Sequence, residues 1–279
     1  MRVLAVFLSL FALIASTASA QAEHLSRVKP LAKAHAHNDY LHTRPLFDAL
    51  DQGFTSVEAD IFLVDGQLLV AHDPAELRPD RTLQSLYLDP LRARVLGNHG
   101  KVYPGKPVAF QLLIDIKNTG VATYAELDRV LRGPRYAFLF TSFVAGRVHK
   151  GPITAVISGD RDRAGMTAQP VRFAFYDGRI LDPNDLGPGA DARLAPLVSD
   201  NWTKVFTWRG TGPMPAAERA RLHEIVGTAH HAGQRVRFWE TPDTPGPARD
   251  AIWRELLDAG VDHINTDDLA GLASFLQGR

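Results

Sequence analysis

Residues 56–73 read Ser-Val-Glu-Ala-Asp-Ile-Phe-Leu-Val-Asp-Gly-Gln-Leu-Leu-Val-Ala-His-Asp, and this stretch contains the features that decide the fold. The apolar, β-branched run 56–64 predicts a buried strand. Asp65-Gly66 predicts a two-residue turn that sends the chain back along that strand. The returning run 68–71 leads directly to His72. We therefore predict a β-hairpin that carries polar side chains within an otherwise apolar strand.

Short β-rich runs alternate with longer stretches of helical pattern along the rest of the chain. Eight runs are predicted as strands, namely 31–37, 56–64, 108–117, 153–159, 171–177, 197–202, 235–240 and 263–267. Parallel strands cannot be joined by tight turns, so strands separated by helices indicate parallel pairing through right-handed crossovers. The pattern predicts an α/β fold, a closed (β/α)₈ TIM barrel.

Two of the connecting helices are clear in the sequence. They cover residues 215–231 and 248–259, and Gly233 and Gly260 follow their last turns. Glycine at that position is typical of a left-handed helix cap. The stretches 97–107 and 182–193 are predicted as loops.

The N-terminus has the pattern of a signal peptide. Arg2 precedes the apolar run 3–15, and Ala18-Ser19-Ala20 fits an A-x-A cleavage site. We expect residues 1–20 to be removed near Ala20, and residues 21–279 to form one domain that is periplasmic or secreted. The apolar run is too short to span a bilayer comfortably and no second one follows, so no transmembrane segment is expected.

Composition excludes several kinds of site. The chain has no cysteine, which excludes disulfides, thiolate metal sites and a thiol nucleophile. Its 31 basic and 31 acidic residues give a formal net charge of zero, which argues against a nucleic acid partner. Functional groups of a barrel collect at the C-terminal ends of its strands. We therefore look for a site where the predicted strands end.

Carboxylates gather at this end of the predicted barrel. Glu58 and Asp60 are two residues apart on one strand, so both side chains leave the same face. Asp115, on the next parallel strand, can join them. Three carboxylates in a small volume repel one another unless a hard cation such as Mg²⁺ or Ca²⁺ binds their oxygens. The sequence therefore predicts a divalent metal site.

His72 needs a local irregularity to reach the same site. In strict hairpin register it lies opposite Ala59, whose side chain points away from the face that carries Glu58 and Asp60. A bulge, or a departure from the ladder just before His72, would bring the imidazole to the metal side.

Four motifs together resemble one known superfamily. They are His35-Ala-His-Asn-Asp-Tyr, Val57-Glu-Ala-Asp, the hairpin that ends His72-Asp-Pro, and Leu112-Leu-Ile-Asp-Ile-Lys. This set resembles the phospholipase C-like phosphodiesterases, which include glycerophosphodiester phosphodiesterases and phosphatidylinositol-specific phospholipases C. It is also similar to the branch named for the fungal altered inheritance of mitochondria protein 6, from about residue 31 to the C-terminus.

The resemblance implies a metal-dependent hydrolase of a glycerophosphodiester or phospholipid-type substrate. His72 and His37 would form the acid–base pair, with His35 as the alternative to His37. Imidazole suits both roles because it titrates near neutral pH. The carboxylates named above, Glu58, Asp60 and Asp115, would hold the metal.

Three further residues are expected to bind the substrate. Lys117 would neutralise phosphate charge, or alternatively form an ion pair with Asp115. Asn38 follows the first histidine motif and would contribute its amide. Trp239 would line the substrate entrance, or alternatively pack into the core. The partner is thus a small-molecule or lipid phosphodiester.

Two alternatives differ from this hypothesis. His35-Ala-His37 resembles the His-x-His zinc pair of amidohydrolases, with Asp267 as a further ligand. Such sites also use histidines from strands five and six, and residues 173–178 and 198–202 contain none. The other alternative is a non-catalytic exported binding module that has kept the barrel. Its sign would be loss of one histidine or carboxylate, and none is obviously missing.

Overall fold

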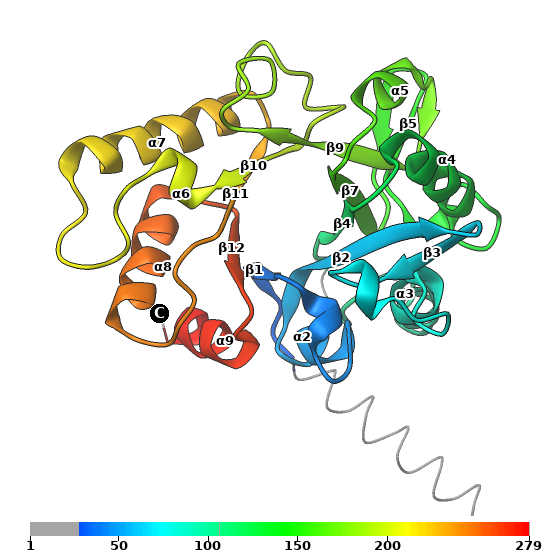
Figure 1. Ribbon diagram of the computed structural model, residues 1–279, viewed down its shortest axis with the longest axis horizontal. Coiled ribbons are helices and arrows are strands. Elements are labelled where there is room, and N and C mark those ends of the chain that lie inside the picture. The colour runs from blue at the N-terminus through cyan, green and yellow to red at the C-terminus, as the bar shows by residue number, and fades with distance from the viewer. Residues whose placement is uncertain (1–27, 106, 279) are drawn as a thin grey trace, which may run out of the picture.

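The computed structural model describes residues 28–105 and 107–278, so the predicted signal peptide lies outside the described residues. Eight parallel strands form a closed ring, with helices around its outside (Figure 1). In order around the ring they are β1 (Leu31–Ala36), β2 (Phe54–Val64), β4 (Phe110–Ile116), β7 (Ile153–Gly159), β9 (Ala174–Arg179), β10 (Leu197–Asn201), β11 (Arg235–Trp239) and β12 (His263–Thr266). Because β1 pairs with both β2 and β12, the predicted TIM barrel is confirmed.

The helices follow the strands in sequence and cover the ring. They are α2 (Phe47–Asp51), α3 (Asp89–Gly97), α4 (Gly120–Leu131), α5 (Arg163–Ala168), α6 (Trp202–Val205), α7 (Ala216–His231), α8 (Pro247–Ala259) and α9 (Leu269–Gln277). Short turns of other helix types occur at η1 (Asp39–Leu41), η2 (Pro74–Glu76), η3 (Gln84–Leu88) and η4 (Ala137–Leu139). Gly260 ends α8 with a φ of 89°, as the sequence predicts. None of the helices in residues 28–105 and 107–278 is long and apolar enough to cross a membrane.

The predicted hairpin is present. Strand β3 (Gln67–Val70) runs antiparallel to β2, and Asp65 and Gly66 form the turn with φ values of 48° and 76°. Both positive values fit a tight two-residue hairpin turn. The regular ladder ends with the pair Ile61 and Val70, so the chain leaves β2 just before His72. This departure is the irregularity that the position of His72 requires.

One predicted strand is divided in the structure. The run 171–177 becomes β8 (Val171–Arg172) and β9, and these belong to different sheets. Strand β8 pairs with β5 (Ser142–Val144), which also pairs with β6 (Arg147–His149) in a small antiparallel sheet. The barrel strand therefore begins at Ala174, because the preceding residues are paired elsewhere.

The interior of the barrel has an apolar half. Leu113, Val156, Phe175 and Leu197 form a separate buried cluster, one residue from each of β4, β7, β9 and β10. Two residues further along the same strands stand four polar residues, Asp115, Ser158, Asp177 and Ser199. Side chains two apart on a strand share a face, so the polar set lies above the apolar cluster, toward the C-terminal end of the barrel.

The other half of the interior is polar and hydrogen-bonded. Arg235 donates to Gln111 at 2.8 Å, and Gln111 donates to Ser56 at 2.9 Å. The Ser56 hydroxyl lies 2.7 Å from His35 Nδ1. Buried polar groups are stable only when they are paired in this way. The chain of contacts supports the charged residues above it from inside the barrel.

Candidate active site

A cavity of about 460 Å³ lies at the C-terminal ends of the barrel strands. It is lined by His37, Asn38, Glu58, His72, Asp115, Lys117, Ser158, Arg179, Arg237, Trp239 and Glu240. Most of the residues singled out in the sequence thus meet at one place. The cavity is the candidate active site.

The three predicted metal ligands converge. Asp60 stands directly beside Asp115 in the register of β2 and β4. One carboxylate oxygen each from Glu58, Asp60 and Asp115 lie within 4.8 Å of one another. Burial and the neighbouring charge of Glu58 raise the pKa of Asp60 to about 6, and the same causes raise the pKa of Asp115. A cation bound between them would favour the ionised forms.

The donor set fits a hard divalent cation. Asp60 Oδ1 is buried and has no hydrogen-bond partner among the residues that the structure describes. The one group of metal-ligand side chains found in those residues consists of carboxylates alone, the donors that Ca²⁺ and Mg²⁺ prefer. It contains no histidine, so it does not support the zinc alternative.

Lys117 joins two of these carboxylates. Its Nζ lies 2.8 Å from Asp60 Oδ2 and 3.1 Å from Asp115 Oδ1, so the ion-pair alternative is present in the structure. Burial opposes the charged form, but the two carboxylates outweigh it and raise the pKa of Lys117 to about 12. Because Lys117 also lines the cavity, its fixed positive charge is available to an anionic ligand.

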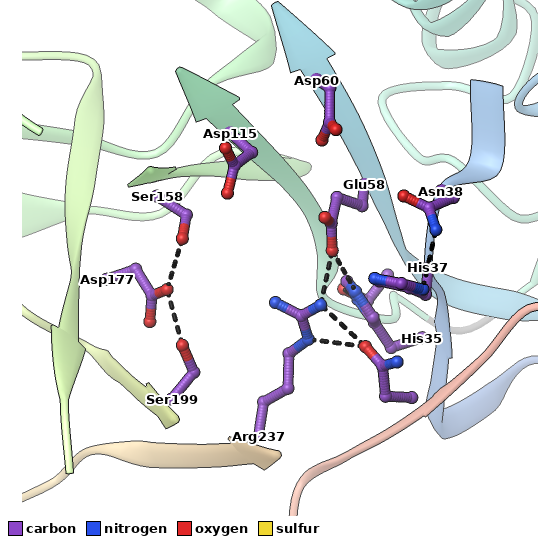
Figure 2. Close-up of polar contacts among 12 residues, drawn as sticks. His35, His37, Asn38, Glu58, Asp60, Asp115, Ser158, Asp177, Ser199 and Arg237 are labelled. Carbon is purple, nitrogen blue, oxygen red and sulfur yellow. Dashed lines mark hydrogen bonds and ion pairs between the residues drawn. The ribbon is translucent and has the colours of Figure 1, made fainter. Parts of the chain in front are cut away.

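Arg237 neutralises Glu58 and was not predicted to take part in the site. Its Nη2 donates to Glu58 Oε2 at 2.5 Å, and Nε and Nη2 donate to Asn265 Oδ1 at 2.9 and 2.7 Å (Figure 2). Burial opposes ionisation of Glu58, but Arg237 outweighs it and holds the pKa of that carboxyl below its usual range. A charge between Val236 and Phe238 was the available signal, since an apolar strand holds a charge only with a partner.

His37 reaches the cavity from the end of β1. Its side chain is 25% exposed, and its Nδ1 lies 2.9 Å from Asp267 Oδ1. The backbone N–H of His37 donates to Thr266 O, which fixes the residue against β12. Burial lowers its pKa, but the hydrogen bond to Asp267 and the charge of Glu58 outweigh burial and raise the pKa above its ordinary value.

His35 is fully buried and does not line the cavity. Its ring nitrogens lie 2.7 Å from Ser56 Oγ and 3.2 Å from Glu58 Oε2, so both are engaged. Burial, assisted by the charge of Arg237, lowers its pKa to about 4. Of the two candidates on β1, His37 is therefore the one placed to meet a ligand.

His72 approaches the carboxylates from the segment after β3. Its Nδ1 lies 3.1 Å from Asp60 Oδ2 and 3.0 Å from the Tyr40 hydroxyl. The side chain is 51% exposed and lines the cavity. Asn38 and the half-buried Trp239, which the sequence predicts to bind the substrate, also line it. Trp202, by contrast, is buried and packs against Phe206 and Phe238.

A second cluster of polar residues beside the cavity was not predicted from the sequence (Figure 2). Asp177 Oδ2 accepts from Ser158 at 2.8 Å, Ser199 at 2.7 Å and Arg179 at 2.7 Å. Asp177 is the last residue of the predicted strand 171–177, but in the structure it lies buried within β9, which continues to Arg179. The sequence feature that could have predicted this cluster is a polar residue near the end of each neighbouring strand.

Comparison with protein families gives two matches. Residues 23–177 match the model described as AIM6-like phosphodiesterase domain, and residues 235–270 match the glycerophosphoryl diester phosphodiesterase family. An altered inheritance of mitochondria protein 6 homolog from Arthroderma benhamiae is 29% identical over 84% of this chain and 81% of its own length. The protein of that name from Eremothecium gossypii is 30% identical over 92% of this chain and 72% of its own length.

Solved structures share the fold at low sequence identity. A calcium-dependent phosphoinositol-specific phospholipase C from a Pseudomonas species matches with a TM-score of 0.54 and 11% identity, over 86% of this chain and 90% of that one. A glycerophosphoryl diester phosphodiesterase from Parabacteroides distasonis matches with a TM-score of 0.52 and 12% identity, over 89% and 87% of the two chains. Both similarities concern the barrel fold.

Proposed function

Because this chain belongs to the AIM6-like phosphodiesterase domain family, we propose that it is a metal-dependent phosphodiester hydrolase. Its substrate class would be a glycerophosphodiester or a phospholipid-type diester. The observation that carries the proposal is one cavity lined by two imidazoles, His37 and His72, and by two carboxylates of the three-carboxylate cluster, whose third member, Asp60, lies behind the lining.

The carboxylates Glu58, Asp60 and Asp115 would hold the metal. When bound, a divalent cation polarises the phosphate and neutralises the charge that repels a nucleophile. Lys117 adds a second positive charge that is already fixed between Asp60 and Asp115. Asn38 and Trp239 would contact the substrate from the cavity wall.

The two histidines would move protons. One imidazole accepts the proton of the attacking hydroxyl, and the other donates a proton to the leaving alkoxide. Each has its Nδ1 beside a carboxylate, His37 beside Asp267 and His72 beside Asp60. Nε2 is therefore the nitrogen left for the substrate on each ring.

A panel of phosphodiesters, assayed with and without chelator, tests the proposal. We expect wild type to lose its activity in excess chelator and to regain it with Ca²⁺ or Mg²⁺ rather than Zn²⁺. His37→Ala and His72→Ala should each lose about 10² to 10⁴ in turnover, the range of a positioned proton-transfer group. The matched control is His149→Ala, at an exposed position outside the cavity.

Three results would distinguish the acid–base roles of the histidines from the binding-module alternative. Recovery of one histidine variant on a diester with a very acidic leaving group would identify that histidine as the proton donor, because such a group leaves without a proton. Full activity of His72→Ala on every substrate would remove the acid–base assignment. Tight binding without turnover by wild type would favour the binding-module alternative.

We also propose that the protein is exported, from the signal-peptide pattern of residues 1–20. N-terminal sequencing of protein recovered from the periplasm or medium should begin just after Ala20. A mature protein that keeps Met1 would contradict this.

A further inference from the structure

Tyr40 contacts both a carboxylate of the metal-binding cluster, Asp60, and a candidate catalytic histidine, His72. It lies in η1, directly after β1, and is only 1% exposed. Its hydroxyl lies 2.6 Å from Asp60 Oδ2, 2.7 Å from the Asn38 side-chain amide and 3.0 Å from His72 Nδ1. Tyr40 does not line the cavity. Its hydroxyl therefore contacts the candidate catalytic groups from within the protein and not from the cavity.

The hydrogen atoms of these contacts can be assigned by their chemistry. A phenol has one hydrogen to donate, and an ionised carboxylate only accepts. The shortest contact is to Asp60, so the Tyr40 hydrogen goes there and the Tyr40 oxygen accepts from its other neighbours. His72 Nδ1 faces Asp60 Oδ2 and the Tyr40 oxygen, both of which accept. This nitrogen must therefore carry a hydrogen.

The same reasoning fixes the Asn38 amide. His37 Nδ1 lies 2.9 Å from Asp267 Oδ1 and so carries a hydrogen. The end of the amide that lies 3.0 Å from this nitrogen is then assigned as the oxygen, because this contact is shorter than the 3.5 Å contact of the same end with Asp267 Oδ1, and the end near Tyr40 is assigned as the nitrogen. This is the reverse of the placement in Figure 2, and the two ends of an amide are assigned from such networks.

The backbone conformation of Asn38 places its side chain between His37 and Tyr40. Its φ is 46° and its ψ is 36°, in the left-handed region that asparagine adopts more readily than most residues. The turn places the amide between His37 and Tyr40. The contacts then form one continuous chain from Asp267 through His37, Asn38, Tyr40 and Asp60 to His72.

We propose that Tyr40 is a positioning residue, which with Asn38 links the two histidines into one hydrogen-bonded unit. The unit holds both imidazoles with Nδ1 protonated and Nε2 toward the cavity. Tyr40 itself touches no reacting atom. This inference rests on the proposed hydrolase function, because it assigns a role to the partners of its two histidines.

Tyr40→Phe tests the link, since it removes one hydroxyl and keeps the buried ring. We expect kcat to fall about 10- to 100-fold, as when a group that orients a catalytic ligand is lost, with KM within about twofold. The matched control is Tyr103→Phe, another buried tyrosine, whose hydroxyl donates to Phe54 O at 2.6 Å, outside the cavity. It should keep the wild-type kcat.

A spectroscopic readout separates positioning from stability. Nitrogen NMR of the histidine rings should show Nδ1–H in both His37 and His72 of wild type. In Tyr40→Phe the His37 signals should shift although Tyr40 does not contact His37, because Asn38 loses its acceptor. Asn38→Gly deletes the link at its other end, and glycine accepts the left-handed backbone. The double variant should be little worse than either single one.

The outcomes distinguish the two proposals. If wild type hydrolyses phosphodiesters through His37 and His72 but folded Tyr40→Phe keeps its kcat and its His37 signals, the link is wrong and the function stands. If wild type hydrolyses no phosphodiester with added Ca²⁺ or Mg²⁺, the function and the inference fall together.

Discussion

Arg237→Met would show how strongly the buried contact between Arg237 and Glu58 stabilises the barrel. The substitution keeps a long side chain in β11 but removes the charge that lies 2.5 Å from Glu58 Oε2. Among the described residues, that oxygen then keeps its contact with His35 at 3.2 Å. Breaking a buried ion pair from one side costs about 3–5 kcal/mol, because the remaining charge has lost its partner. For a domain of this size, that loss lowers Tm by roughly 6–20 °C.

The measurement is a double-mutant cycle by urea unfolding in chelator, so that no metal compensates Glu58. It compares wild type, Arg237→Met, Glu58→Gln and the double variant. The double variant should be about 2 kcal/mol more stable than Arg237→Met, since no unpaired charge stays buried.

Arg235→Met is the matched control, because Arg235 lies two residues earlier on β11 and contacts Gln111 and His263 rather than a carboxylate. Its loss should be clearly smaller than that of Arg237→Met. Equal losses for the two methionine variants would refute the reasoning, as would a double variant no more stable than Arg237→Met.

Three further changes have expected outcomes. Glu58→Gln should weaken Ca²⁺ binding by calorimetry while circular dichroism stays native, and unchanged affinity would place the metal elsewhere. Burial raises the pKa of Asp39 from 3.8 to about 7, so the free energy of unfolding falls as pH rises between these values. Urea unfolding at pH 4.5 and 7.5 measures this fall, which should be roughly 2–4 kcal/mol smaller in Asp39→Asn than in wild type. Gly159→Ala should destabilise more than Gly146→Ala, because both have positive φ but only the Gly159 Cβ would meet Ile116 O, at 2.3 Å.

The barrel was predictable because the alternation of short β-rich runs with helical stretches repeats along the chain. The strand predicted at 153–159 is β7, and most other predicted strands differ from the structure by no more than two residues at either end. The small sheet was missed because its strands, such as β5 and β6, have only three residues each and show no clear alternation.

The carboxylate cluster was predictable because spacing and topology determine it. Glu58 and Asp60 share a face, and parallel pairing brings Asp115 beside Asp60. The choice between His35 and His37 was open because they are two residues apart at the end of one predicted strand, whereas the structure separates them by burial and by their partners. Arg237 was missed since its contact with Glu58 joins residues 179 apart in sequence, which meet only in the closed barrel.

The pairing of β1 with β12 has a consequence for the nascent chain. Ala34 lies opposite Ile264 and Ala36 opposite Thr266, so one edge of the first strand lacks its partner until the last strand has left the ribosome. His37 depends on the same event, because its backbone donates to Thr266 and its imidazole contacts Asp267. A chain interrupted before these residues has an open barrel and an unanchored His37, so the candidate site cannot form until β12 and Asp267 have been synthesised.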